Sequence, residues 1–281
     1  MKRILSICFA LLLVSSLLSA YDSTIKIEID GVVLKNDVDP ELKNNRVMVP
    51  IRVISENLGV TVNWTDSVVI LTKKNLNITF NLKQNTVTKN GTTVSLDMNP
   101  YIKNGRLMVP LRFISETFGS GVQYKNGTVS IQNEPLVINN QKVGALQSTT
   151  YMTMGSIVQQ LKVNSYIKDF YTIFTENKVK ATTAPESYSR RYETDIPGHY
   201  VTGGPFEFLD PNGQSIKTFE IYTLVETFPE EMIKGYPKTL LFDVTENRWY
   251  LLKAETEQLI LELMDKAYTN GLLEVISNNV A

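Results

Sequence analysis

The feature that most constrains the fold of this chain is an internal repeat. The stretch NNRVMVPIRVISENLG, residues 44–59, recurs as NGRLMVPLRFISETFG, residues 104–119, at an offset of 60 residues. The correspondence extends to two aromatic residues and two turn dipeptides, namely Trp64 and Tyr124, and Asp30-Gly31 and Asn90-Gly91. A repeat of this length is a supersecondary unit. The sequence therefore predicts two tandem units, residues 25–84 and 85–133.

Each unit is predicted to form a small sheet laid against one short helix. Asp-Gly or Asn-Gly between alternating β-formers is a strong hairpin signal. The helix is expected to begin at Pro50 or Pro110, because proline suits the first helical turn, and to end at Gly59 or Gly119. Its apolar face has i, i+3, i+7 spacing, in Ile51, Ile54 and Leu58 and again in Leu111, Ile114 and Phe118.

These repeated residues carry a family resemblance. The order Val-Pro, apolar residue, Arg, then Glu, Gly, Val and an aromatic residue resembles the copper amine oxidase N-terminal-like domain. This domain, also called the stalk domain, is common in secreted and surface proteins of Firmicutes. The resemblance covers residues 25–133. It implies a non-catalytic, predominantly antiparallel α+β module that accompanies other domains.

The oxidase chemistry is not expected in this chain. Copper amine oxidases hold copper with three histidines and build a cofactor from a tyrosine in an Asn-Tyr-Asp/Glu setting. Here His199 is the one histidine, and no Asn-Tyr pair occurs. Since imidazole is the expected ligand for such copper, we expect no oxidase activity, no metal and no cofactor.

The first twenty residues have the layout of a secretory signal peptide. A positive MKR start precedes an apolar stretch and a small-residue end, LSA, before Tyr21. Because Leu18 is unusual at the −3 position, an uncleaved anchor remains the alternative. Cys8 is the single cysteine and lies in this segment, so the mature chain is expected to have no disulfide. We predict a secreted, extracellular protein, with attachment to the cell envelope as one option.

Charge and motifs exclude several function classes. Lys+Arg number 28 against 29 Asp+Glu, so no basic excess exists to neutralise a nucleic-acid backbone. Phosphate-binding loops, dinucleotide signatures, H-E-x-x-H and G-x-S-x-G do not occur. One histidine and no mature cysteine exclude zinc sites and thiol nucleophiles. A Ser-His-Asp arrangement would require His199, with Asp195 near it in sequence.

Residues 134–163 allow two interpretations. A hairpin is expected around Asn139-Asn140, followed by a helix within Tyr151–Val163, which aligns with Met48–Val60. The segment is either a degenerate third unit or an unrelated hairpin and helix. It acts as a linker in the second case.

Residues 164–281 are predicted to form a separate α+β domain of helix, antiparallel meander and helix. Ile167, Phe170 and Phe174 share one helical face. A turn is expected at residues 210–213, and a second hairpin contains Trp249 and Tyr250. The last helix is predicted to use Leu259, Leu263 and Ala267 as its apolar face.

Two groups of residues are candidates for ligand binding. Arg52 and Arg112 each precede a glutamate by four residues, Glu56 and Glu116, which indicates either a surface ion pair or a repeated contact for an anion or carboxylate. The second group is a loop-like segment with aromatic and arginine residues, Tyr188, Arg190, Arg191, Tyr192 and Tyr200. Such a segment suits flat polar ligands such as glycans, or its aromatics cover the core of a sheet.

The sequence favours a secreted or cell-surface scaffold that binds rather than catalyses. Its repeats would present the C-terminal domain, with cell-wall glycan or another surface protein as partner, and contact with a membrane only if the signal segment stays uncleaved. The first alternative is an extracellular hydrolase that uses paired carboxylates within residues 164–281. The second is self-assembly of the repeats through exposed strand edges.

Overall fold

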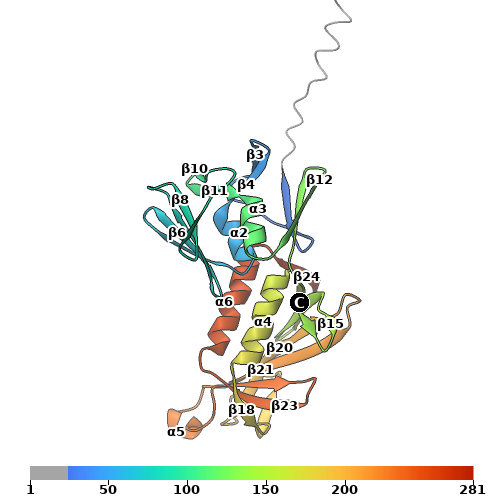
Figure 1. Ribbon diagram of the computed structural model, residues 1–281. Helices are drawn as coiled ribbons and strands as arrows, with labels where there is room; N and C mark the ends of the chain where they lie inside the picture. The colour runs from blue at the N-terminus through green and yellow to red at the C-terminus, as the bar shows by residue number, and fades with distance from the viewer. Residues whose placement is uncertain (1–24, 281) are drawn as a thin grey trace, which may run out of the picture.

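The computed structural model describes residues 25–280 and shows a strand-rich α+β protein with several sheets and few helices (Figure 1). The predicted α+β class is confirmed at this level. The predicted signal peptide, residues 1–20, lies outside the described residues. Within the part described, no helix is long and apolar enough to cross a membrane.

The two repeated units meet in a central sheet of order β10-β11-β4-β3. Its strands are β3 (Glu41–Lys43), β4 (Arg46–Pro50), β10 (Tyr101–Lys103) and β11 (Arg106–Pro110). β4 and β11 are antiparallel, with Val49 opposite Val109 and Met48 opposite Pro110. Since Val49 and Val109 are equivalent positions, the units are related by a pseudo-two-fold axis that passes between these two residues.

The repeated helices follow directly from this sheet, as predicted. They are α2 (Ile51–Asn57) and α3 (Leu111–Thr117), which contact each other. Pro50 and Pro110 are the residues before their first turns. Gly59 and Gly119 have φ angles of 72° and 82°, the left-handed conformation that ends a helix.

The outer sheets combine strands from both units. One has the order β5-β6-β7-β8-β9 and the other β12-β13-β1-β2. The first contains β5 (Thr61–Thr65), β6 (Val68–Lys73), β7 (Leu76–Asn81), β8 (Thr86–Lys89) and β9 (Thr92–Val94). The second contains β12 (Gly121–Lys125), β13 (Thr128–Gln132), β1 (Lys26–Ile29) and β2 (Val32–Val33), with β1 parallel to β13.

The expectation of one small sheet for each unit is therefore corrected. Each outer sheet joins the end of one unit to the start of the other. The hairpin β1–β2 is too small to bury Ile27 and Ile29 by itself, and both become fully buried in the sheet with β13. The hairpin turns themselves are as predicted, with positive φ at Asp30-Gly31 and Asn90-Gly91.

Residues 134–163 contain strands where a helix was predicted. The hairpin around Asn139-Asn140 is present as β14 (Val137–Ile138) and β15 (Gln141–Lys142). The helix within Tyr151–Val163 is wrong, because the chain forms β16 (Ala145–Met152), a turn and β17 (Gly155–Leu161). Gly155 has a φ of 125°, a conformation unsuited to a helix, and so the alignment with Met48–Val60 is not supported.

The C-terminal part is built on a large antiparallel sheet. In the described chain its order is β18-β23-β22-β21-β20-β16-β17-β24, with β19 parallel to the start of β20. The strands not yet given are β18 (Lys178–Thr182), β19 (Ser187–Ser189), β20 (His199–Leu209), β21 (Ser215–Leu224), β22 (Thr239–Asp243), β23 (Arg248–Leu252) and β24 (Leu273–Asn278). The predicted hairpins β20–β21 and β22–β23 are thus present, and the sheet begins before residue 164.

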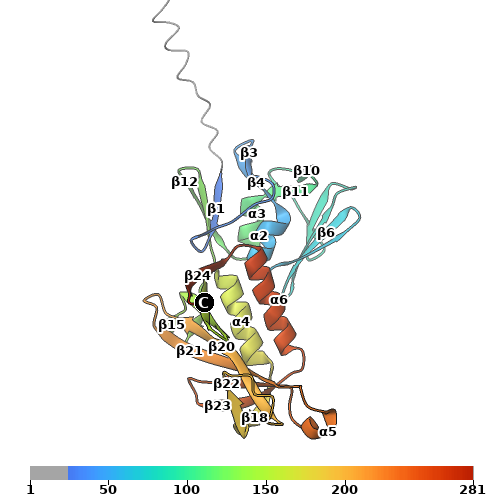
Figure 2. The ribbon, with the colours of Figure 1, turned by 180° about the vertical axis from the view of Figure 1, so that it is seen from behind.

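Two helices cover one face of this sheet. α4 (Asn164–Glu176) and α6 (Thr256–Thr269) lie side by side and run from the large sheet to α2 and α3 (Figure 1, Figure 2). Phe170 and Phe174 of α4 stack on the sheet against Phe206 and Phe219. Thr256, Ile260 and Ala267 of α6 are buried and Leu263 packs against the core, so the predicted face is confirmed at Leu263 and Ala267, while Ile260 is buried in place of Leu259. A short helix, α5 (Glu230–Ile233), precedes β22.

The two parts are joined by polar contacts at the start of α4. The Asp30 carboxylate accepts hydrogen bonds from the backbone N–H groups of Asn133 (2.7 Å) and Asn164 (2.8 Å). Ser165 donates from its hydroxyl to the carbonyl of Asn57 at 2.7 Å. The apolar core is also continuous between the parts. These contacts fix α4 against the N-terminal part.

Candidate functional site

Two grooves in the N-terminal part are related by the pseudo-two-fold axis. The larger has a volume of about 530 Å³ and the smaller about 240 Å³. Five lining residues of the larger groove are Arg46, Asp97, Pro110, Arg112 and Tyr124. Their equivalents 60 residues away line the smaller groove, namely Arg106, Asp37, Pro50, Arg52 and Trp64. The repeat has thus produced the same combination of side chains twice.

The helix and the neighbouring strand position the exposed side chains of each groove. Arg52 and Arg112 follow the start of α2 and α3, and their side chains are 57% and 67% exposed. Trp64 on β5 and Tyr124 on β12 are 39% and 54% exposed. The Trp64 indole N–H donates to the carbonyl of Asp66 at 2.9 Å, which orients the ring. Large aromatic faces are therefore left open to water beside each groove.

Ion pairs between the units complete the grooves. Arg46 pairs with Asp97, and the equivalent Arg106 pairs with Asp37. In each pair the arginine comes from one unit and the aspartate from the other. All four side chains are about half exposed, so their polar edges are accessible to a ligand while each guanidinium is held in place.

Arg52 and Arg112 also form surface ion pairs, which is the other interpretation that their sequence spacing allows. Arg52 lies 3.9 Å from Glu56, and Arg112 lies 3.6 Å from Glu116. Charges nearly cancel in the larger groove, where Arg46 and Arg112 face Asp97 and Glu116, whereas the smaller groove is lined by two arginines and one carboxylate. A flat aromatic face beside planar polar groups suits a sugar ring, whose C–H face packs on the aromatic ring while its hydroxyls form hydrogen bonds. The chemistry fits neutral or weakly acidic sugars better than strongly anionic ligands.

The candidate residues of the C-terminal part do not line these grooves. They also do not form one site, because some are buried and others are exposed. Tyr200 is 1% exposed and donates its hydroxyl to the carbonyl of Pro237 at 2.6 Å, which places it in the core. Tyr188 is 45% exposed and packs edge-on against Trp249. Arg190 lies over the ring of Tyr151 at 4.2 Å. Tyr192 is 61% exposed.

His199 and Arg191 serve to fasten the loop between β19 and β20. His199 is 2% exposed, and its Nδ1 lies 2.7 Å from the hydroxyl of Ser187. Its Nε2 lies 3.1 Å from the carbonyl oxygen of Arg191. The ring nitrogen opposite Ser187 thus contacts a backbone carbonyl rather than a carboxylate such as Asp195, and Ser187 is at Nδ1 rather than at the Nε2 that the serine of a catalytic triad contacts.

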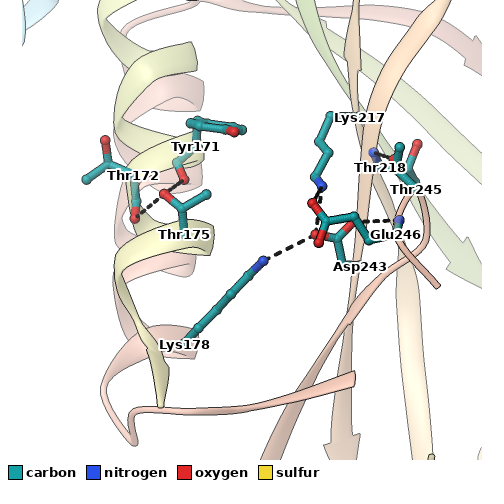
Figure 3. Close-up of polar contacts among 9 residues, drawn as sticks. All are labelled: Tyr171, Thr172, Thr175, Lys178, Lys217, Thr218, Asp243, Thr245 and Glu246. Atoms are coloured by element: carbon teal, nitrogen blue, oxygen red, sulfur yellow. Dashed lines mark hydrogen bonds and ion pairs between the residues drawn. The ribbon is translucent and has the colours of Figure 1, made fainter. Parts of the chain in front are cut away.

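A pair of carboxylates in the C-terminal part is engaged by lysines (Figure 3). Asp243 is fully buried and contacts Lys217 at 2.7 Å and Lys178 at 3.2 Å, while Glu246 contacts Lys217 at 2.7 Å. Burial lowers the pKa of Lys217, but the hydrogen bonds to Asp243 and Glu246 outweigh it, so the pKa is raised. Asp243 has no exposed surface, so its carboxylate is closed to a glycan substrate, whereas Glu246 is about half exposed.

Of the predicted candidates, Arg52 and Arg112 line the grooves, but the other groove residues were not predicted. The repeat matches Trp64 with Tyr124 but does not indicate that these rings are exposed, and it gives no sign that Arg46 pairs with Asp97 or Arg106 with Asp37. The available signal was that polar and aromatic residues recur at the 60-residue offset together with the apolar ones. Apolar positions recur because the fold needs them, whereas exposed arginines and aromatics have no such requirement.

Comparison with known proteins places both grooves within a recognised domain. Residues 28–133 match the family model described as the copper amine oxidase N-terminal domain. No curated protein and no solved structure matches the chain significantly. Among residues 25–280, no group of three or more His, Cys, Asp or Glu side chains could hold a metal ion.

Proposed function

We propose that this protein is a secreted or cell-surface binding protein without catalytic activity, and that its N-terminal part binds cell-wall glycan through the two grooves. The observation that carries the proposal is the recurrence of an exposed aromatic ring, an exposed arginine and an Arg–Asp pair in both grooves. The family match to an N-terminal, non-catalytic domain is consistent with it.

The second element of the proposal is that the N-terminal part presents the C-terminal domain at a fixed position. The hydrogen bonds of Asp30 with Asn133 and Asn164, and of Ser165 with Asn57, support a rigid junction. A ligand held in the grooves would then place the large sheet at a defined distance from the wall. This is a scaffold function, in which specificity lies in the N-terminal part.

The test is co-sedimentation of the protein with purified peptidoglycan sacculi at moderate salt. The double variant Trp64→Ala with Tyr124→Ala is compared with Tyr268→Ala, which removes a tyrosine on α6 that is 71% exposed and lines neither groove. Losing both aromatic contacts is expected to weaken binding by at least about tenfold, since anchor residues each contribute more than ~1 kcal/mol. Tyr268→Ala should bind as the wild type does.

Two outcomes would contradict the proposal. If the wild type does not pellet saturably with sacculi, glycan is not the ligand, and another surface protein becomes the partner to seek. If sugar fragments are released with turnover during the incubation, the protein is a hydrolase. A Glu→Gln series in residues 164–281 would then identify its carboxylates.

A further inference from the structure

We propose that the two grooves bind two glycan strands at the same time, and that these strands run in opposite directions. The protein would then act as a cross-bridge between strands. This inference rests on the proposed function, because it assumes that the grooves bind glycan.

The first step is that the grooves recognise the same chemistry. Each presents an aromatic face, a helix-borne arginine and an Arg–Asp pair at positions related by the 60-residue offset. A sugar unit that fits Tyr124 and Arg112 therefore finds the same groups at Trp64 and Arg52. The grooves differ in size and in part of their lining, since Phe113 takes the place of Val53 and Glu116 lines the larger groove while its equivalent Glu56 does not line the smaller. The two affinities are expected to differ, while the ligand class is the same.

The second step is that the grooves are held rigidly relative to each other. β4 pairs with β11 across the axis, and Met48 and Met108 are fully buried beside this pairing. The two cross-unit ion pairs join β4 to the loop that contains Asp97 and β11 to the loop that contains Asp37. No part of the protein has to become ordered when the second groove is filled. Once one groove holds a strand of a glycan mesh, the neighbouring strands are therefore present at a high effective concentration near the second groove. Such linkage increases the apparent affinity by about 10²–10⁴-fold.

The third step follows from the symmetry. The antiparallel pairing of Val49 with Val109 gives an axis that reverses direction from one groove to the other. A two-fold axis reverses every direction perpendicular to itself, so glycan strands that lie across the axis and make the same contacts in both grooves run in opposite directions. One straight strand cannot satisfy both grooves, whereas two neighbouring strands can. The geometry therefore selects cross-bridging over binding along a single strand.

The experiment uses the full protein and two probes, which are soluble disaccharide-peptide fragments of peptidoglycan and soluble, uncross-linked glycan strands. Calorimetry with the fragments should give two bound per chain for the wild type and one for either Trp64→Ala or Tyr124→Ala. Mixed with the strands, the wild type should form particles that grow in light scattering with protein concentration. Either single variant should bind the strands without particle growth, and Tyr268→Ala serves as the matched control.

The cross-bridge is overturned if the wild type binds one fragment per chain, or if a single variant drives particle growth as strongly as the wild type. The second result would indicate that the protein bridges strands by self-association. In both cases glycan binding itself survives. If the wild type binds neither probe, the proposed function fails instead, so the two failures are distinguishable.

Discussion

At the scale of single residues, the pseudo-two-fold axis explains an unusual pair of buried hydroxyls. Ser55 and Ser115 are equivalent positions on α2 and α3, both are fully buried, and neither hydroxyl has a hydrogen-bond partner. The hydroxyl is not expected to increase the free energy of unfolding over that of an alanine at the same position, because an unpaired buried polar group is destabilising.

We therefore predict that Ser115→Ala leaves the free energy of unfolding unchanged or raises it by up to about 1 kcal/mol. The matched variant is Ser165→Ala, which removes a hydroxyl that is also buried but donates to the carbonyl of Asn57. It should lower the free energy of unfolding by about 1 kcal/mol. Denaturant unfolding of both variants provides the measurement. Equal destabilisation by the two changes would show that the hydroxyl of Ser115 is bonded after all.

A polar cluster near the axis makes stability depend on pH. The hydrogen bond from Lys103, and then that from Tyr101, hold the pKa of the Glu41 carboxyl below its usual value. Because the pKa of Glu41 is lower in the folded than in the unfolded state, its stabilising contribution is complete above the unfolded pKa, about 4.3. It is lost as the pH falls through the folded pKa.

Glu41→Gln is accordingly expected to lower the free energy of unfolding near neutral pH by about 1 kcal/mol, the upper range for partly exposed pairs. The difference from the wild type should shrink as the pH is lowered from about 5 to about 3. The control is Glu56→Gln, which breaks a looser pair with Arg52 and should cost at most a few tenths of a kcal/mol. A difference for Glu41→Gln that stays constant over this range would exclude the carboxylate as its origin.

At the scale of elements, the long strand β20 depends on one glycine of an adjacent pair. Gly204 has a φ of 135°, and a Cβ added there would lie 1.8 Å from the carbonyl oxygen of Thr149 on β16. A Cβ on Gly203 would meet nothing within 4 Å. We predict that Gly204→Ala lowers the free energy of unfolding by ~3 kcal/mol or more, whereas Gly203→Ala changes it by less than ~1 kcal/mol. Thermal unfolding of the two variants tests this, and equal midpoints would contradict it.

The elements also show which parts of the fold the sequence could predict. The helices after Pro50 and Pro110 and the hairpin at residues 210–213 depend on local signals, and they were predicted correctly. The pairing of β1 with β13 joins residues about a hundred positions apart, and no local pattern indicates it. The same limit applies to the grooves, since each is closed by an Arg–Asp pair from two different units. At Tyr151–Val163, the alignment with Met48–Val60 predicts a helix, but the chain instead forms β17, which pairs with β16 and β24.

At the scale of the whole molecule, the exchange of strands means that the first unit cannot complete a sheet alone. β1 and β2 belong to the sheet of β12 and β13, while β8 and β9 of the second unit belong to the sheet of β5–β7. We predict that fragments 25–84 and 85–280, produced separately, form a one-to-one complex when mixed. Light scattering after gel filtration measures its mass, and the first fragment alone should show no cooperative unfolding. Two fragments that remain separate would refute the shared architecture.

The central claim is that glycan binds in the grooves of the N-terminal part, and the two tryptophans of the chain allow a direct test. Trp64 lies in the smaller groove, whereas Trp249 is 8% exposed within the aromatic cluster of the large sheet. In an NMR titration with soluble disaccharide-peptide fragments, the indole N–H signal of Trp64 should shift saturably while that of Trp249 stays in place. Assignment follows from Trp64→Phe. A shift of Trp249 with Trp64 unmoved would place the binding site on the C-terminal sheet and contradict the account.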